Sequence, residues 1–126
     1  MTLVFEFRPS ERIVIDTARL EELFRRLGDH GAETHVIEAV EAISDLLAEV
    51  DGFVRRDALS EIAPRAQQVS RLSADIGLTS LARVARDMSI AANRKDVVAF
   101  RAVWERLIRI GDRSLTQVWE LPGLSL

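Results

Sequence analysis

The feature of this 126-residue sequence that most constrains its fold is the helical spacing of apolar residues along almost its whole length. In the clearest segment, apolar side chains recur at intervals of four, three, four and three residues, at Val36, Val40, Ile43, Leu47 and Val50. Because a helix turns once every ~3.6 residues, this spacing places all of them on one face. The sequence therefore predicts an all-α protein.

Capping residues and glycines divide the first half of this pattern into two helices. Asp16 or Thr17 is expected to cap a short leading helix that stops at Gly28. A second helix is expected to begin near residues 31–34 and to run to about Val50, with a further turn available after it.

Three more helices follow in the second half. The third is expected to start at the cap Asp57 and to end at Gly77, with a kink or a delayed start caused by Pro64. The fourth is expected to close at Asn93, and the fifth to begin at the cap Asp96. The intervening loops are only a few residues long, which favours antiparallel neighbours.

These elements predict one domain over residues 1–126: an antiparallel up-down four-helix bundle, at about 14–118, with a short leading helix. Residues 3–7, Leu-Val-Phe-Glu-Phe, have strand-like composition. A single strand cannot form a sheet alone, so we expect an extended N-terminal arm there.

Composition argues against most enzyme classes. The chain has no Cys and only two His, which excludes thiol catalysis and Cys-ligated metal sites. His30, in an expected Gly-flanked loop, and His35 are five positions apart, about 140° around a helix, so they do not share a face. Glycine-rich phosphate loops and nucleophile elbows are also missing. We therefore expect no enzyme activity, no cofactor and no metal, and surface positions for both histidines.

Charge gives a further indication of partners. The net charge of −3 disfavours nucleic acid as a partner. The first 50 residues hold 5 basic and 11 acidic side chains, whereas residues 51–126 hold 12 and 9. An acidic partner would thus meet the second half more favourably, although charge alone favours the simpler explanation of ordinary solvated faces that happen to segregate. With neither a secretory signal nor a membrane-spanning run, we expect a cytoplasmic protein with no membrane partner.

One stretch carries a family resemblance. Residues 66–77, AQQVSRLSADIG, followed by LTSLA, resemble the signature region of histidine phosphotransfer (Hpt) domains. That motif runs Ala-His-x-Leu-Lys-Gly-Ser, then a helix-closing Gly and an Ala/Leu-rich helix. Residues 15–23 and 93–96 resemble the leading segment and the last turn of the family, so the resemblance covers about residues 14–118. It implies a bundle of the two-component phosphorelay type, whose partner is a response-regulator receiver domain or a histidine kinase.

The departures from the motif decide what the resemblance implies about activity. Aligned on Ala66 and Gly77, the phospho-accepting His falls at Gln67, the following Lys at Ser70 and the Gly at Arg71. A Gln amide nitrogen is delocalised into its carbonyl and is not nucleophilic. Ser70 cannot supply the charge of Lys, and Arg71 places a long side chain where Gly would admit a partner backbone. The site is therefore expected to be a degenerate phosphosite, and the chain an adaptor or decoy.

A docking strip follows from the helical spacing. If Ala66, Val69 and Ser73 face the core, the neighbouring positions form an exposed strip. We call it the docking strip: Arg65, Gln67, Gln68, Ser70, Arg71 and Ala74. Its arginines, with Arg83 and Arg86, would suit the acidic pocket of a receiver. They would equally serve only to keep the face hydrated.

Two alternatives remain open. The bundle could be a dimerisation or scaffold module unrelated to phosphorelay, with an exposed apolar patch that includes Phe5, Phe7, Trp119 or Leu121. It could also be an active phosphotransfer protein that uses His30 or His35 as its acceptor.

Overall fold

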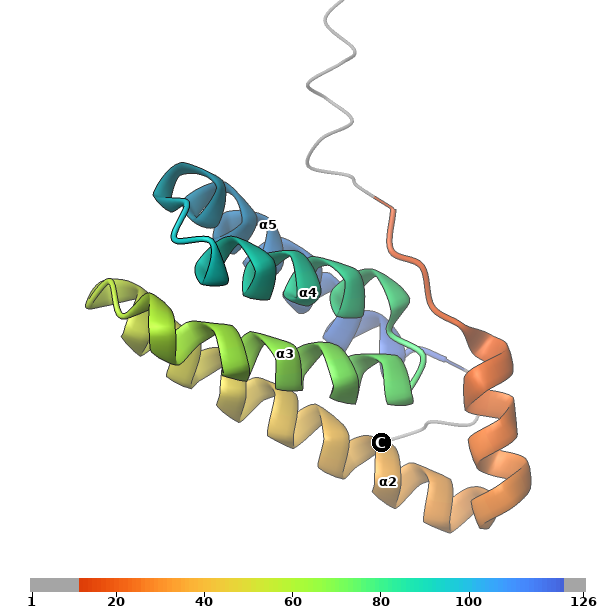
Figure 1. Ribbon diagram of the computed structural model, residues 1–126. Coiled ribbons are helices and arrows are strands. Elements are labelled where there is room, and N and C mark those ends of the chain that lie inside the picture. The colour runs from red at the N-terminus through yellow and green to blue at the C-terminus, as the bar shows by residue number, and fades with distance from the viewer. Residues whose placement is uncertain (1–11, 122–126) are drawn as a thin grey trace, which may run out of the picture.

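The computed structural model describes residues 12–121, so the expected arm at residues 3–7 lies outside the described part of the chain. Four helices follow one another, α2 (Thr17–Arg55), α3 (Leu59–Asp75), α4 (Thr79–Asn93) and α5 (Val97–Val118). Within residues 12–121 there is no strand. The predicted all-α antiparallel four-helix bundle is confirmed (Figure 1).

Helix α2 consists of two helical segments that meet at Gly28. Asp16 caps the first segment, because its Oδ1 accepts a hydrogen bond of 3.2 Å from the backbone N of Arg19. Gly28 has φ 78°, which favours glycine, and the short leading segment consequently lies at a steep angle to the rest of α2 (Figure 1). A single residue makes this turn, so the predicted start near residues 31–34 and the loop around His30 are wrong: the chain is helical again directly after Gly28.

The start of α3 also differs from prediction. Its N-cap is Ala58, without a side-chain hydrogen bond, so the predicted cap at Asp57 is wrong. Asp57 instead takes the left-handed conformation, φ 53°, and its Oδ1 lies 3.4 Å from Nη2 of Arg101. Pro64 lies inside α3 and does not delay its start. The backbone carbonyl that Pro64 cannot engage belongs to the exposed Ser60, where water can hydrate it.

Gly77 ends α3, as predicted, and joins the α3–α4 turn to the leading helix. Its φ is 81°, and a Cβ built on it would lie 2.6 Å from the carbonyl oxygen of Asp16. The backbone N of Asp16 donates to the Gly77 carbonyl at 2.7 Å, and the N of Val14 donates to Oγ of Ser80 at 2.7 Å. The segment that enters the leading helix is thus fastened to the start of α4.

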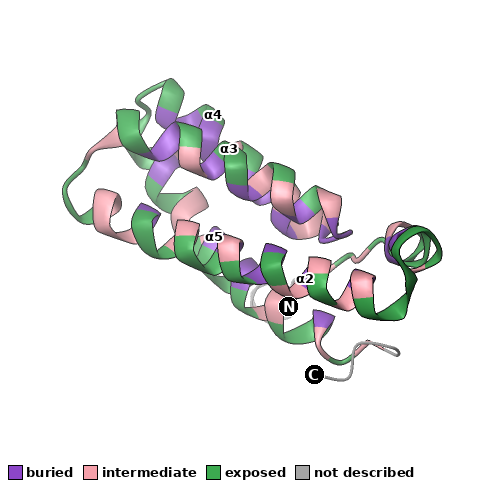
Figure 2. Cartoon of the chain, turned by 90° about the horizontal axis from the view of Figure 1, so that it is seen from below, coloured by how far each residue is buried: buried purple, intermediate pink, exposed green. Residues whose placement is uncertain are grey.

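The core lies where the inward faces of the helices meet (Figure 2). Helix α3 packs against α2 and α4, and α4 packs against α5. The leading helix contributes Leu20 and Leu23 to the same core. The largest fully buried side chains are Phe100, Leu23, Ile43, Ile62, Ile76, Leu78, Leu81, Met88, Leu107, Ile110 and Val36.

The ends of the last two helices lie where the sequence predicts. Helix α4 ends at Asn93, and Asp96 caps α5 by accepting a hydrogen bond of 3.1 Å from the backbone N of Ala99. At the other end of α5, Trp119 and Leu121 are half-buried against the core. None of the helices of residues 12–121 combines the length and apolar character needed to cross a membrane.

Candidate functional site

Helix α3 turns one face to the core and the opposite face to solvent. Ala66, Val69 and Ser73 are fully buried. On the other face, four members of the docking strip are exposed: Gln67, Gln68, Arg71 and Ala74. The 3.6-residue repeat of a regular helix accounts for this division, because residues three or four positions apart lie on the same face. Most of the docking strip is therefore accessible to a partner.

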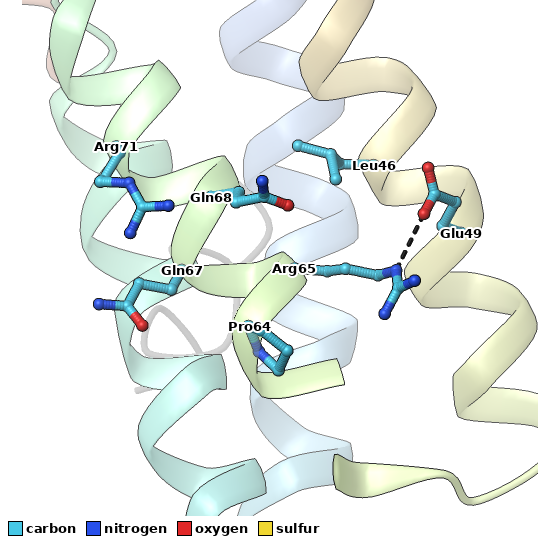
Figure 3. A pocket seen from close by; sticks show the side chains of 7 residues that line it. All are labelled: Leu46, Glu49, Pro64, Arg65, Gln67, Gln68 and Arg71. Atoms are coloured by element: carbon cyan, nitrogen blue, oxygen red, sulfur yellow. Dashed lines mark hydrogen bonds and ion pairs between the residues drawn. The ribbon is translucent and has the colours of Figure 1, made fainter. Parts of the chain in front are cut away.

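An open pocket of about 470 Å³ lies along this strip, between α2 and α3. Leu46 and Pro64 contribute apolar surface to it, and the remaining lining residues are polar: Glu49, Arg65, Gln67, Gln68 and Arg71. Figure 3 shows that Gln67 and Arg71 extend to one side of α3, whereas Arg65 extends towards Glu49 on α2. The strip thus has one side that faces α2 and another that continues towards α4.

Gln67 stands at the middle of the strip, where the resemblance places a phospho-accepting histidine. Its side chain is exposed and makes no hydrogen bond to another described residue. The carboxamide can donate and accept hydrogen bonds, but it has no nucleophilic nitrogen. Gln67 is therefore suited to a polar contact with a partner rather than to covalent chemistry.

Arg65 is held within the molecule. Its Nε lies 2.9 Å from Oε1 of Glu49, and its Nη1 donates to the carbonyl of Glu61 at 2.9 Å. Its guanidinium also lies 4.5 Å from the centre of the Phe53 ring. The hydrogen bond to Glu49 raises the pKa of Arg65. Arg65 consequently joins α3 to α2, and it is not free to pair with a partner without breaking these contacts.

Ser70 faces α4 rather than solvent. Its hydroxyl donates a hydrogen bond of 2.8 Å to the carbonyl of Ala82, and the residue is half-buried. Ser70 therefore contributes to the contact between α3 and α4.

Three exposed arginines lie on the outer side of the α3–α4 hairpin. Arg71, Arg83 and Arg86 are exposed and form no ion pair with another described residue. The acidic groups of the same hairpin and its loops are all engaged: Asp57 with Arg101, Glu61 with Arg65, Asp75 with Arg19 and His35, Asp87 with Arg106, and Asp96 as the cap of α5. The outer face of this hairpin therefore presents uncompensated positive charge.

Asp75 lies at the end of the strip and bridges two parts of α2. Its Oδ1 is 2.8 Å from Nη2 of Arg19, and its Oδ2 is 2.6 Å from Nε2 of His35. Nε of Arg19 also donates to the Asp75 backbone carbonyl at 2.8 Å. Partial burial works to raise the pKa of Asp75, but the hydrogen bonds from His35 and Arg19 outweigh it, so this pKa lies below its ordinary value. We call this cluster the Asp75 bridge.

Sequence reasoning missed the Asp75 bridge. It joins residues that are 40 and 56 positions apart, and each one alone is an ordinary polar residue on a helix. His35 is part of this bridge, whereas His30 is exposed near the start of the second segment of α2. Among residues 12–121, no three acidic or histidine side chains are grouped to hold a metal ion.

Comparisons of the sequence with protein families and curated proteins, and of the structure with solved structures, find no match to this chain. The resemblance to phosphotransfer domains accordingly rests on the segments quoted above.

Proposed function

We propose that this chain is a phosphotransfer-like bundle that binds a receiver domain or a histidine kinase of two-component signalling without accepting a phosphoryl group. The observation that carries the proposal is the position of Gln67, exposed at the middle of an accessible strip of α3. A partner that docks along this strip meets an amide where an acceptor imidazole would stand. The chain then acts as an adaptor or a decoy, not as an enzyme.

The charge of the surface supports docking with an acidic partner. Arg71, Arg83 and Arg86 are exposed, and within the described part of the chain they have no ion pair to break before they meet a carboxylate. Unpaired guanidiniums around a contact surface accelerate association with an acidic surface and select against basic ones. Receiver domains carry an acidic pocket, so the proposed partner has the complementary charge.

The experiment is a binding titration against the receiver domains and histidine kinases of the native host, with wild type and Arg71→Glu. The matched control is Arg109→Glu, which makes the same charge change at an exposed position of α5. We expect at least one receiver or kinase to bind wild type and the control alike, and the Arg71 variant about tenfold more weakly. Binding by none of them would refute the proposal.

Self-association is the competing function, and one feature of α5 favours it. Val97 and Val98 open this helix with 49% and 82% of their surfaces exposed. Sedimentation of wild type and Val98→Asp measures the oligomeric state of each protein directly. A dimer that the substitution dissociates would support a dimerisation module; a monomer at all concentrations would leave the docking proposal in place.

The remaining alternative is phosphoryl transfer through another histidine. Nε2 of His35 is engaged by Asp75, and His30 has neither a lysine nor a glycine in the positions of the motif. Loss of phosphate labelling in His30→Ala or His35→Ala would support this alternative against our proposal.

A further inference from the structure

Arg71 has one acidic neighbour on its own helix. The residues three or four positions away are Gln67, Gln68, Ala74 and Asp75. Oppositely charged side chains four residues apart on a helix commonly pair across one turn. Asp75 is therefore the group on α3 that could neutralise Arg71.

In the structure Asp75 is not available to Arg71. Arg19 holds its Oδ1 and His35 holds its Oδ2, at 2.8 and 2.6 Å. Arg71 is exposed and forms no ion pair with a described residue. Glu49, which lines the same pocket as Arg71, is likewise held, by Nε of Arg65 at 2.9 Å. Carboxylates beside the docking strip are thus occupied by contacts within the molecule.

Arg19, which binds Oδ1 of Asp75, belongs to the leading helix, and this helix meets the rest of α2 at Gly28. This helix is fixed to the α3–α4 turn by the backbone hydrogen bond from Asp16 to Gly77, of 2.7 Å, and by the Asp75 bridge. The position of the leading helix therefore determines whether Oδ1 of Asp75 is occupied, whereas His35, on the second segment of α2, holds Oδ2.

We propose that the leading helix regulates the docking strip: by occupying Asp75, it keeps Arg71 unpaired and available to an acidic partner. Displacement of the helix removes Arg19 and frees Oδ1 of Asp75, while His35 keeps its contact with Oδ2. The freed oxygen then pairs with Arg71, which lowers the positive charge of the strip. The inference rests on the proposed function, since it names the regulation of the same surface. The coupling is a competition of Arg71, Arg19 and His35 for one carboxylate.

The expected effect of this competition on partner binding is small, because the residues involved lie at the protein surface. Arg71 and Asp75 are at the protein surface, where a single ion pair changes an equilibrium by only a few-fold. We therefore expect the release of Asp75 to weaken partner binding about two- to fivefold, and the effect to shrink as salt is added.

A set of variants separates this competition from simple damage to the leading helix. The release variant is Arg19→Gln/His35→Gln, which frees both carboxylate oxygens, and adding Asp75→Asn to it removes the carboxylate itself. Arg25→Gln, at an exposed position of the leading helix, controls for the loss of one positive charge. The measurement is the affinity for the receiver or kinase that binds wild type.

We expect the release variant to bind more weakly than wild type, and the added Asp75→Asn to restore the affinity, although it cannot rebuild the bridge. Asp75→Asn alone is expected to bind at least as tightly as wild type. If Asp75→Asn fails to restore binding, or weakens it by itself, the competition is refuted and the bridge has a structural role only.

A second measurement needs no partner. The pKa of Asp75 is followed through its carboxyl carbon by NMR, with and without Arg71→Gln, in wild type and in the release variant. We expect Arg71→Gln to leave this pKa nearly unchanged in wild type and to raise it in the release variant, where Arg71 becomes the partner of Asp75. Equal effects in both backgrounds would refute the inference. Because this result does not depend on a receiver, its failure is distinguishable from failure of the proposed function.

Discussion

Nη2 of Arg19 lies 2.8 Å from Oδ1 of Asp75, which joins the leading helix to the C-terminal end of α3. The two residues are 56 positions apart in the sequence. Their contact lies one helical turn from Arg71, at the end of the docking strip. The bundle's stability and its proposed binding surface therefore share one carboxylate.

The stability of the protein should depend on pH through Asp75. Its pKa is lowered in the folded state, so its stabilising contribution is present above the unfolded-state pKa of about 3.9 and is lost as the pH falls through the folded value. Because the group is partly exposed, we expect less than about 1 kcal/mol. The difference in unfolding free energy between wild type and Asp75→Asn should shrink as the pH falls below about 4. A constant difference from pH 7 to pH 3 would contradict this assignment.

Gly77→Ala should destabilise the protein by about 2 kcal/mol or more. The substitution forces a side chain into φ 81° and places Cβ 2.6 Å from the backbone oxygen of Asp16. Urea unfolding measures the change. The control is Gly52→Ala, in the interior of α2, where only Nη2 of Arg56 lies within 4.0 Å of the added Cβ. We expect it to stabilise by about 0.5–1 kcal/mol; similar losses at both glycines would contradict the close approach at Gly77.

Two buried serines should be replaceable with a gain in stability. Oγ of Ser73 and Oγ of Ser114 are buried and have no hydrogen-bond partner among residues 12–121. A buried hydroxyl without a partner carries an uncompensated desolvation cost, so Ser→Ala at either position should stabilise by about 1 kcal/mol. Thermal unfolding of both variants, with the exposed Ser44→Ala as control, is the measurement. Destabilisation of both would show that these hydroxyls are satisfied.

Substitution of Arg65 should mainly lower the stability of the protein, whereas substitution of Arg71 should mainly weaken partner binding. Arg65→Ala removes the ion pair with Glu49 and the contact with the Phe53 ring, so the melting temperature should fall. Arg71→Ala removes an exposed side chain that forms no hydrogen bond or ion pair with another described residue, so the unfolding free energy should change by no more than about 0.5 kcal/mol while partner affinity falls. Paired melting and binding curves decide between these roles. A large stability loss in the Arg71 variant would show that this side chain has an internal partner.

Local patterns were sufficient to predict most of the helices. Asp16 and Asp96 cap helices where the sequence predicts, because their side chains contact backbone nitrogens only three residues away. Gly77 ends α3 for a similarly local reason, its positive φ. The predicted cap at Asp57 is wrong because aspartate is frequent both at caps and in left-handed turns. Its contact with Arg101, 44 residues away, cannot be predicted from the local pattern.

The candidate site was predictable as a row of exposed residues but not in its internal bonding. Helical spacing alone places Gln67 and Arg71 on the solvent side of α3. It cannot show that Arg65 is bound to Glu49 on α2, or that the Ser70 hydroxyl donates to a carbonyl of α4. Those contacts depend on how the helices pack, which local spacing does not determine. Fewer residues of the docking strip are consequently available to a partner than the sequence predicts. Of its two arginines, Arg71 is the one that forms no ion pair with a described residue.

Rebuilding the motif tests whether the strip is a degenerate phosphosite. The variant Gln67→His/Ser70→Lys/Arg71→Gly restores the nucleophile, the positive charge and the open approach that the motif supplies. We expect it to accept phosphate from a phosphorylated receiver, whereas Gln67→Leu carrying the same two additional changes should not. Failure of the rebuilt variant, while it remains folded and bound to the receiver, would show that this position is not equivalent to the acceptor site.

The most direct test of the account combines binding and transfer in one measurement. Wild-type protein is mixed with each phosphorylated receiver domain and each phosphorylated histidine kinase of its host, and complex formation and acid-labile phosphate on this chain are measured in the same samples. We predict a complex with at least one receiver or kinase and no phosphate on the wild-type chain, because Gln67 offers no nucleophilic nitrogen. Phosphate on the wild-type chain, or no complex with any receiver or kinase, would contradict it.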